Sequence, residues 1–157
     1  MMISDNIRRI QSTDLQRIVE LEQRCFSKQN AYTKRQLQYL ITRANSCCLA
    51  EVENEIIRGF IIVLYRKGAR VAGIETISVD PCYQGKGIGQ KLLIAAELEM
   101  YHRSINRVRL EVSLGNMPAI RLYEKLGFRR ILILKNYYMN QYFGTNDAFR
   151  MIKDLAI

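Results

Sequence analysis

The chain has 157 residues, of which 48% are hydrophobic and 25% charged, and its formal net charge at pH 7 is +9. This length predicts one domain over residues 1–157, with enough apolar side chains for a single core. No apolar run approaches the ~20 residues that cross a bilayer, and the polar start of the chain does not resemble a secretory signal, so we expect a cytoplasmic protein without a membrane segment.

The Lys and Arg residues are scattered rather than gathered into one long basic run. Direct nucleic-acid binding is therefore not expected, and the positive charge instead suits an anionic ligand or an acidic partner. The four cysteines lack the C-x-x-C spacing of a metal site or a redox pair. We expect reduced thiols and no bound metal.

The first half of the chain is predicted to contain two helices among its strands. Ser12 or Thr13 can cap the first helix, whose apolar stripe includes Ile18, Val19 and either Leu21 or Glu22. The predicted elements are a strand at 3–10, a helix that continues through Cys25, a helix near 33–44, a hairpin of strands 47–52 and 56–65 with its turn at 53–55, and a strand at 71–79.

The second half is predicted to alternate helices with strands. In the strand at 107–112, Arg107, Arg109 and Glu111 share one face, while the apolar residues share the other. A helical crossover at 88–104 implies that the strands before and after it run parallel. The predicted elements are a helix at 88–104, a strand at 107–112, a helix that starts near Pro118 and stops at Gly127, a strand at 128–134, a loop at 136–146 and a strand at 148–153.

A glycine-rich turn, Gln84-Gly85-Lys86-Gly87-Ile88-Gly89, separates the strand at 71–79 from the helix after it. Unpaired amides at a helix start favour an anion, and glycine lets the backbone approach a ligand closely, so the turn predicts a phosphate cradle. A dinucleotide-binding loop would need a third glycine at position 90, which is Gln90. A P-loop and a kinase glycine loop do not fit either.

The pattern that remains, Q-x-x-G-x-G before a helix, resembles the pyrophosphate-binding motif [QR]-x-x-G-x-[GA] of the GNAT family of acetyl-coenzyme A-dependent N-acetyltransferases. Residues 110–128 resemble the ending L-E-V-x-x-x-N-x-x-A-x-x-L-Y-x-x-x-G-F of the branch that acetylates protein N-termini, including the ribosomal-protein alanine acetyltransferases. The resemblance implies the GNAT fold, an α/β (α+β mixed sheet) arrangement of order βααβββαβαββ. Its sheet splays between the fourth and fifth strands, where the cofactor enters.

The resemblance also implies acetyl-coenzyme A as cofactor and a role for each matching residue. Glu111 would be the general base acting through water, Tyr123 the general acid that protonates the departing thiolate, and Glu75 a carboxylate facing the substrate amine. Backbone groups of Ile77, Ser78 and Val79 would pair with the pantetheine arm. The implied cofactor-binding residues are completed by Gln84, Gly85, Lys86, Gly87, Ile88, Gly89, Gln90, Asn116 and Tyr123.

Taken without the resemblance, these residues have plainer interpretations. Glu111 shares a strand face with two arginines and reads as a solvated residue, whereas Tyr123 lies on an apolar stripe and reads as a core tyrosine. Asn116 could simply cap the next helix. Glu75 lies in an apolar strand, where a carboxylate is costly unless it is paired or functional.

The predicted reaction is direct transfer of an acetyl group to a primary amine, with the N-terminal α-amine of a protein favoured. A small-molecule amine (polyamine, amino sugar or amino acid) and a non-catalytic sensor of acetyl-coenzyme A are the alternatives. The acceptor side departs from the branch pattern, because the run from Cys25 to Tyr32 lacks the usual Trp and Pro. Tyr137 and Tyr138 resemble the family's substrate-side hairpin. We expect a monomer or a homodimer.

Overall fold

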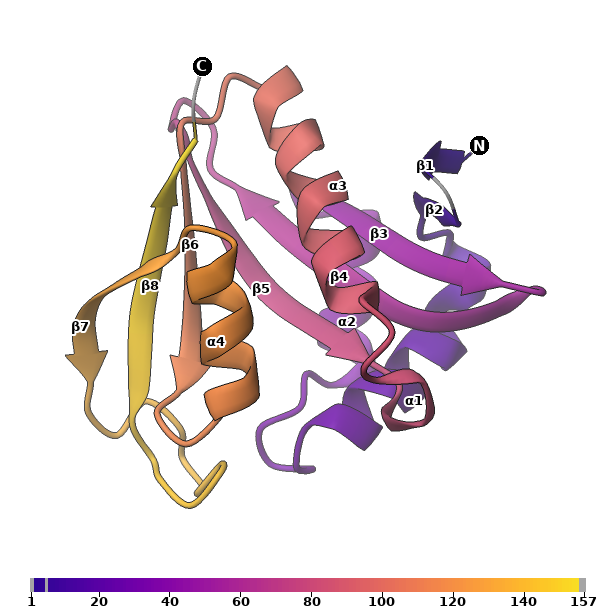
Figure 1. Cartoon of the computed structure of the whole chain (residues 1–157). Coiled ribbons are helices and arrows are strands. Elements are labelled where there is room, and N and C mark those ends of the chain that lie inside the picture. The colour runs from indigo at the N-terminus through magenta and orange to yellow at the C-terminus, as the bar shows by residue number, and fades with distance from the viewer. Residues whose placement is uncertain (1, 5, 156–157) are drawn as a thin grey trace.

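The computed structural model describes residues 2–4 and 6–155. Within them, eight strands form one mixed sheet in the order β1-β2-β3-β4-β5-β6-β8-β7. Helices α3 and α4 cover one face of the sheet and α1 and α2 the other (Figure 1). The strands are β1 (Met2–Ser4), β2 (Ile7–Arg9), β3 (Ser46–Glu53), β4 (Ile56–Tyr65), β5 (Val71–Val79), β6 (Arg107–Ser113), β7 (Arg129–Leu134) and β8 (Ala148–Asp154). The helices are α1 (Leu15–Cys25), α2 (Lys34–Thr42), α3 (Ile88–His102) and α4 (Met117–Lys125), with 3₁₀ turns at η1 (Ser12–Asp14) and η2 (Pro81–Tyr83).

The predicted first strand at 3–10 is wrong in its continuity. Two short strands, β1 and β2, pair antiparallel there, and Asn6 between them has a φ of 66°. Asparagine tolerates this left-handed conformation, which turns the chain back on itself. The predicted cap is wrong as well, because Ser12 and Thr13 lie inside the 3₁₀ turn η1. The amide at the start of that turn, that of Gln11, instead donates to Asp14 Oδ2 at 2.7 Å.

From residue 33 onward the predicted elements are confirmed, with ends that differ by a few residues. Thr33 caps α2, because its Oγ1 accepts from the amide of Gln36 at 3.2 Å. Gly127 follows α4 with a φ of 99°, a conformation that ends helices and favours glycine. The mixed sheet and the helical crossover through α3 are as predicted, with one additional short strand at the start of the chain.

The core has two layers that meet at β4. Ile61 and Val63 point toward α3, whereas Phe60 and Ile62 pack against α1 and α2. A strand covered on both faces needs apolar residues at successive positions, which explains the unbroken apolar run of β4. None of the described helices is long and apolar enough to cross a bilayer.

The sheet splays between β5 and β6, as the family resemblance implied. These parallel strands pair only from Val71 opposite Arg107 to Gly73 opposite Arg109. Beyond those three pairs the strands separate, while β5 stays paired with β4 and β6 stays paired with β8 (Figure 1). The divergence leaves the second half of β5 with an unpaired backbone edge.

Candidate active site

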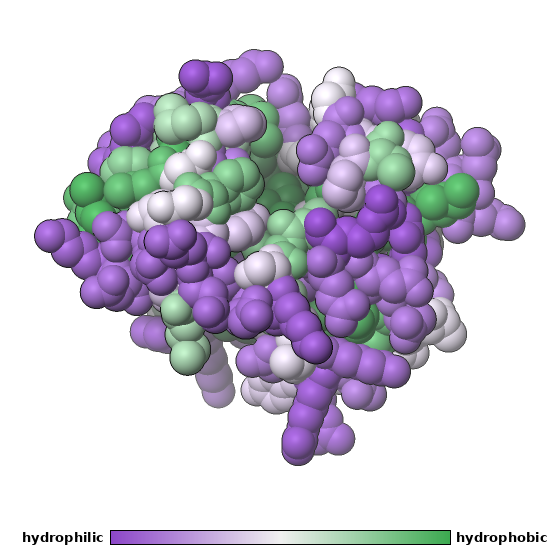
Figure 2. All heavy atoms as spheres, turned by 90° about the horizontal axis from the view of Figure 1, so that it is seen from below, coloured by the Kyte–Doolittle hydropathy of each residue, from purple (hydrophilic) through white to green (hydrophobic). Residues whose placement is uncertain are grey.

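A cleft of about 1070 Å³ opens where β5 and β6 separate. Its walls come from both strands, the turn before α3, the start of α4, the segment between α1 and α2, and the loop between β7 and β8. The face shown in Figure 2 has apolar atoms in a recess surrounded mainly by hydrophilic side chains. Segments distant in the sequence therefore meet around one open cleft.

The glycine turn forms one end of this cleft. Gly85 and Gly87 have φ values of 81° and 78°, in the left-handed region that favours glycine. A Cβ at either position would meet no atom within 4 Å, so the turn is open to an approaching group. Gly87 is also the N-cap of α3, whose first amides lack partners within the helix. The helix dipole adds partial positive charge there, so the turn fits a phosphate group.

Strand β5 presents main-chain groups to the gap at alternate residues. The amide of Asp80 donates to the carbonyl of Arg58 in β4 at 2.8 Å, so the backbone groups of Asp80 face β4. In an antiparallel pair every second residue has the same orientation, so the backbone groups of Ser78 face β4 as well. The backbone groups of Ile77 and Val79 therefore face the gap. Of the three predicted backbone contacts, Ile77 and Val79 are the two that an extended ligand could reach.

Side chains also hold the turn to the end of β5. Gln84 Nε2 and Cys25 Sγ both contact the carbonyl oxygen of Val79, each at 3.2 Å. Gln84 thus braces the turn, in addition to its predicted place in the phosphate cradle. Lys86 is exposed at the tip and does not line the cleft.

A β-bulge in β5 explains the carboxylate in this apolar strand. Ile62 of β4 is opposite Thr76 and Val63 is opposite Ile74, which leaves Glu75 without a partner in the register. A bulge adds one residue to a strand and re-aims the side chains beside it. The alternation of faces along β5 therefore shifts by one residue at this position.

Because of this shift, Glu75 projects away from the apolar layer. Ile74 before the bulge and Ile77 after it both pack toward α3. The Glu75 side chain lies on the opposite face, where Oε2 accepts from the hydroxyl of Tyr32 at 2.7 Å. Its hydrogen-bond partner is thus a neutral group, and the carboxylate lines the cleft.

A second, fully buried carboxylate positions Tyr32. Glu22 of α1 is 1% exposed and accepts from the Tyr32 amide at 3.0 Å, from Thr76 Oγ1 at 2.8 Å and from Ser78 Oγ at 3.2 Å. Burial raises the pKa of Glu22, and these three donors oppose that shift. The contacts fix the segment after α1 to the bulged part of β5.

Glu111 has a different environment from Glu75. Arg109 Nη1 lies 3.3 Å from its Oε1 and 3.2 Å from its Oε2, and Arg150 Nε lies 3.1 Å from Oε2. The Glu111 side chain is 13% exposed, so these are partly buried ion pairs. Both oxygen atoms of Glu111 are therefore engaged by guanidinium groups. The plain interpretation, a solvated strand residue beside two arginines, is corrected to a paired carboxylate on the cleft wall.

Tyr123 is both a core residue and a cleft residue. It is 7% exposed, packs edge-to-face on Phe128 with ring centroids 5.8 Å apart, and lines the cleft. Burial raises the pKa of Tyr123 to about 12. The hydroxyl is therefore protonated at neutral pH.

Asn116 has the capping role that its position before a helix suggests. Its Oδ1 accepts from the amide of Ala119 at 3.4 Å, at the start of α4. Asn116 also lines the cleft, so the cap places this side chain beside the gap. A contact between Asn116 and the cofactor stays a prediction.

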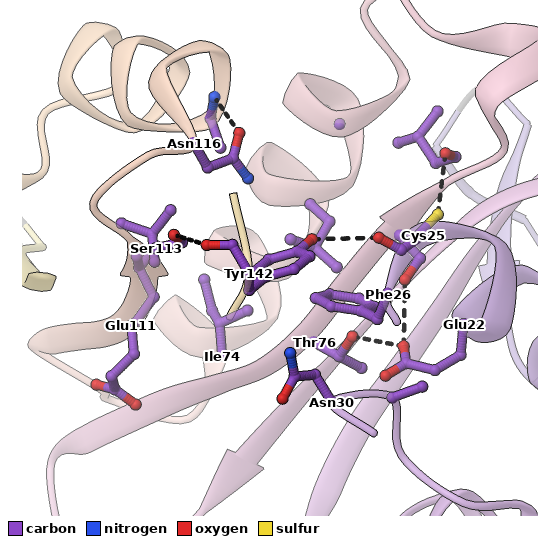
Figure 3. Close-up of a pocket in the computed structure, with 18 of the residues that line it drawn as sticks. Glu22, Cys25, Phe26, Asn30, Ile74, Thr76, Glu111, Ser113, Asn116 and Tyr142 are labelled. Carbon is purple, nitrogen blue, oxygen red and sulfur yellow. Dashed lines mark hydrogen bonds between the residues drawn. The ribbon is translucent and has the colours of Figure 1, made fainter. Parts of the chain in front are cut away.

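The loop between β7 and β8 spans the cleft through Tyr142. Ser113 Oγ of β6 donates to the Tyr142 carbonyl at 2.6 Å, and the Tyr142 hydroxyl donates to the Cys25 carbonyl at the end of α1 at 3.2 Å. The Tyr142 ring also stacks on Phe26 with a centroid distance of 5.5 Å. Figure 3 shows Tyr142 lying between these two sides of the cleft. Tyr142 therefore ties together the two halves of the splayed sheet.

The tip of this loop is a tight turn held against the start of α4. The Tyr142 amide donates to the Thr145 carbonyl at 2.8 Å, and both residues between them have positive φ, 56° at Phe143 and 77° at Gly144. A Cβ on Gly115 would lie 2.1 Å from the Phe143 carbonyl oxygen, so only glycine fits there. This contact fixes the loop over the cleft.

All predicted site residues except Lys86 line the cleft. Tyr137 and Tyr138, in the loop between β7 and β8, stand edge-to-face with ring centroids 5.0 Å apart. The lining residues that were predicted are Glu75, Ile77, Ser78, Val79, Gln84, Gly85, Gly87, Ile88, Gly89, Gln90, Glu111, Asn116, Tyr123, Tyr137 and Tyr138.

Sequence reasoning placed Arg109 on the same strand face as Glu111, but it missed the roles of Tyr32 and Glu22 and the contact of Arg150 with Glu111. Tyr32 ends the run from Cys25 that lacks the usual Trp and Pro, and its hydroxyl donates to Glu75. Glu22 carried a signal, since a carboxylate on the apolar stripe of a helix needs a buried partner. No sequence pattern indicated a role for Arg150, because this residue contacts Glu111 only through the pairing of β6 with β8.

The chain belongs to the acetyltransferase (GNAT) family, whose family model matches residues 15–128. The match confirms the resemblance seen in the two motifs. It covers the segment from α1 to the residue before β7, including the glycine turn and both strands that border the gap.

Among individual proteins, the chain is 38% identical over 86 residues to the ribosomal protein bS18-alanine N-acetyltransferase of Escherichia coli, a stretch that covers 55% of this chain and 57% of that protein. It is 41% identical over 81 residues to the N-alpha-acetyltransferase RimI of Mycobacterium tuberculosis, covering 52% and 48% respectively. The matched stretch thus spans about half the length of these curated relatives. The crystal structure of ribosomal-protein-S18-alanine N-acetyltransferase from Escherichia coli is similar over 96% of this chain and 94% of that one, with a TM-score of 0.86 and 28% identity.

Proposed function

We propose that this protein transfers the acetyl group of acetyl-coenzyme A to the N-terminal α-amine of a protein. The observation that carries the proposal is the continuity of one cleft. It runs from the open glycine turn, along the unpaired edge of β5, to a space that holds Glu75, Glu111 and Tyr123. The names of the relatives, which are N-acetyltransferases of protein α-amines, support the choice of acceptor.

The residues present fit coenzyme A in two places. The turn at Gly85 and Gly87 has the open backbone and helix start that hold a diphosphate. Ile77 and Val79 offer main-chain groups to an amide-containing arm, as a neighbouring strand would. When bound, the coenzyme supplies the acetyl group as a thioester. A main-chain amide facing the gap, that of Val79 or Ile77, can donate to the carbonyl oxygen of that group.

The acceptor amine must lose a proton, and an α-amine loses it readily. With a pKa of 7.7–8.0, an α-amine is neutral in roughly a tenth of molecules at pH 7, against about one in a thousand for a lysine side chain. A carboxylate acting through water is then a sufficient base. Such proton transfer contributes about 10²–10⁴-fold to an enzymatic rate.

Glu75 is the better placed of the two carboxylates to take this proton. One of its oxygens accepts from a neutral hydroxyl, that of Tyr32, and no described residue donates a hydrogen bond to the other. Both oxygens of Glu111 are bound by guanidinium groups, so protonating Glu111 would disrupt charge-assisted hydrogen bonds. We therefore assign proton removal to Glu75 and electrostatic organisation of the acceptor side to Glu111.

Tyr123 supplies the other proton. As the nitrogen–carbon bond forms and the carbon–sulfur bond breaks, the sulfur leaves as a thiolate, whose parent thiol has a pKa near 8.5. The Tyr123 hydroxyl is protonated at neutral pH because burial raises its pKa to about 12. It can donate its proton to the leaving sulfur and regain one from water.

Mass spectrometry after incubation with acetyl-coenzyme A tests the proposal on a panel of peptides and free small amines. One acetyl group on the first residue of a peptide is the expected product. Activity on free polyamines, amino sugars or amino acids alone would contradict it. Calorimetry with coenzyme A, run in parallel, identifies a protein that binds the coenzyme without turnover, as a sensor would.

Two tyrosine variants test the assigned proton donor. Tyr123→Phe is expected to lower kcat by about 10²-fold while coenzyme affinity stays unchanged. Tyr65→Phe is the matched control, because Tyr65 is 6% exposed and its buried hydroxyl has no hydrogen-bond partner in the described part of the chain. Equal kcat values for the two variants would contradict the assignment.

A further inference from the structure

Two arginines flank Glu111 on the side of the sheet from which an acceptor would approach. Arg150 of β8 is directly opposite Glu111 in the pairing register, and Arg109 precedes Glu111 by two residues, so all three side chains share one face. Helices α1 and α2 pack against β3, β4 and β5 (Figure 1), and the three side chains lie beyond β5. Glu111 lines the cleft, and the two arginines lie directly behind it as its ion-pair partners.

Glu111 uses only part of the hydrogen-bonding capacity of these arginines. It accepts from Arg109 Nη1 and Arg150 Nε, whereas Arg109 Nη2 and both Nη atoms of Arg150 donate no hydrogen bond to the described residues. The arginine side chains are 37% and 32% exposed, against 13% for Glu111. One negative charge thus lies beside two positive charges, and the unused N–H donors belong to partly exposed side chains.

Arg109 also lies close to the place assigned to the acceptor amine. Gly73 pairs with Arg109 across the last joined residues of β5 and β6. A Cβ on Gly73 would lie 3.0 Å from Arg109 Nη2 and 3.8 Å from Glu75 Oε1, so both side chains reach the space above this glycine. Glu75 is two residues beyond Gly73, about 7 Å along a strand. An extended peptide covers that distance in about two residues.

The half-exposed ring of Tyr137 lies within the same group of charges. Its pKa is raised mainly by burial, then by the negative charges of Glu111 and Glu75, while the positive charges of Arg109 and Arg150 oppose the shift. The four charged groups are therefore near one tyrosine of the substrate-side loop. Tyr137 and Glu111 both line the cleft, so the arginine pair lies beside the part of the cleft wall that they form.

We propose that Arg109 and Arg150 bind an acidic side chain at the second or third residue of the acceptor. This inference rests on the proposed function and specifies its substrate class. Planar guanidinium groups with unused donors match a carboxylate, and the bonds that form are charge-assisted. A Lys or Arg at the same acceptor position meets two positive charges and is disfavoured.

A peptide series tests this specificity. Peptides of one length begin with Ala and carry Glu, Gln or Lys at the second position, and in a second set at the third position. For the wild type, kcat/KM is expected to be about tenfold higher for Glu than for Gln at one of these positions, and lower again for Lys. The ratio should shrink as ionic strength rises.

Arg150→Gln is the decisive variant. It should bring the Glu-to-Gln ratio to about one, because any loss that acts through the ion pair with Glu111 lowers kcat/KM equally for both peptides and cancels in the ratio. Arg129→Gln is its control, because Arg129 belongs to β7, is exposed and pairs with Asp154, so the variant removes the same charge elsewhere. The control should keep the full ratio.

Three outcomes overturn the inference. An equal rate on Glu and Gln peptides by the wild type would do so, while leaving peptide acetylation itself intact. An equal loss for every peptide in Arg150→Gln would show that Arg150 only positions Glu111. If the wild type binds coenzyme A but acetylates no peptide, the proposed function fails and this specificity fails with it.

Discussion

The two ends of the cleft are built in different ways. At the coenzyme end, one continuous segment from β5 through the glycine turn into α3 supplies the open backbone and the helix start. At the acceptor end, separate parts of the chain are joined by side-chain contacts: Tyr32 with Glu75, Arg150 with Glu111, and Tyr142 with Cys25. Local chain geometry thus forms the coenzyme end, whereas tertiary packing forms the acceptor end. Substitutions should separate the two ends experimentally.

The largest expected effect is at the acceptor end. Glu75→Gln keeps the shape of the side chain but removes the carboxylate to which we assign proton removal, so kcat/KM for a peptide should fall about 10²–10⁴-fold. Glu111→Gln removes a carboxylate that is already bound by two arginines and should lower kcat/KM by about tenfold. A larger loss in Glu111→Gln than in Glu75→Gln would reverse the assignment of the base.

Asp80 connects the end of β5 with α1, and its substitution should lower the stability of the fold. Its 2%-exposed carboxylate binds Arg17 and Arg24 of α1, each at 2.9 Å, at the point where β5 leads into the glycine turn. Asp80→Asn should lower the free energy of unfolding by about 3 kcal/mol in urea titrations. Glu20→Gln removes an exposed partner of the same Arg17 and should change it by no more than about 0.5 kcal/mol.

The same carboxylate predicts a pH dependence. Burial alone would raise the pKa of Asp80, but hydrogen bonds from the Cys82 amide and Arg17, with the charge of Arg24, hold the pKa below its ordinary value. Its stabilisation is therefore present above the unfolded-state pKa near 4 and is lost as pH falls below it. Asp80→Asn should lose stability less steeply than the wild type in acid. Parallel acid-unfolding curves would contradict this.

The coenzyme end should respond to a change in one glycine. Gly87→Ala forces a side chain into the left-handed conformation, which costs about 1–2 kcal/mol, so the turn should relax and bind coenzyme A about tenfold more weakly by calorimetry. Gly68→Ala is a close match, because Gly68 has the same φ of 78° with no atom near a Cβ, but lies between β4 and β5 away from the cleft. It should lose similar stability and keep full affinity; equal losses of affinity would contradict a specific role for the turn.

The smallest expected effect concerns the connection across the cleft. Tyr142→Phe removes the hydroxyl that donates to the Cys25 carbonyl and keeps the ring that stacks on Phe26. One neutral hydrogen bond is worth about 1 kcal/mol, so KM for a peptide should rise about fivefold while coenzyme affinity is unchanged. Tyr39→Phe, on the exposed face of α2, is the control. A parallel loss of coenzyme affinity would show that the two ends are not separable.

Most of the fold was predictable because it depends on local patterns. The apolar stripes of α1 and α2, the alternation of β6 and the glycine after α4 each report a local conformation, and these elements lie where they were expected. The cap of the first helix was one exception, and the first strand was the other. A positive φ at Asn6 divides it, and an Asn in a polar segment gives only a weak signal for such a turn.

The candidate site was predictable in part, for the same reason. Glycines at fixed spacing before a helix specify an open turn, so the coenzyme end followed from consecutive residues. The face on which Glu75 projects did not, because a bulge in the pairing with β4 decides it. The partners of Glu111 did not either, because the register between β6 and β8 brings Arg150 opposite it.

The sequence by itself therefore determined the family, the order of elements from residue 33 onward and the turn that fits a diphosphate, because each depends on neighbouring residues. Only the tertiary structure decided the charge environment of the two carboxylates. Glu75 faces a neutral hydroxyl and Glu111 faces two guanidinium groups. The physical reason is that electrostatic environment is set by distances across strands and loops, which consecutive residues do not encode.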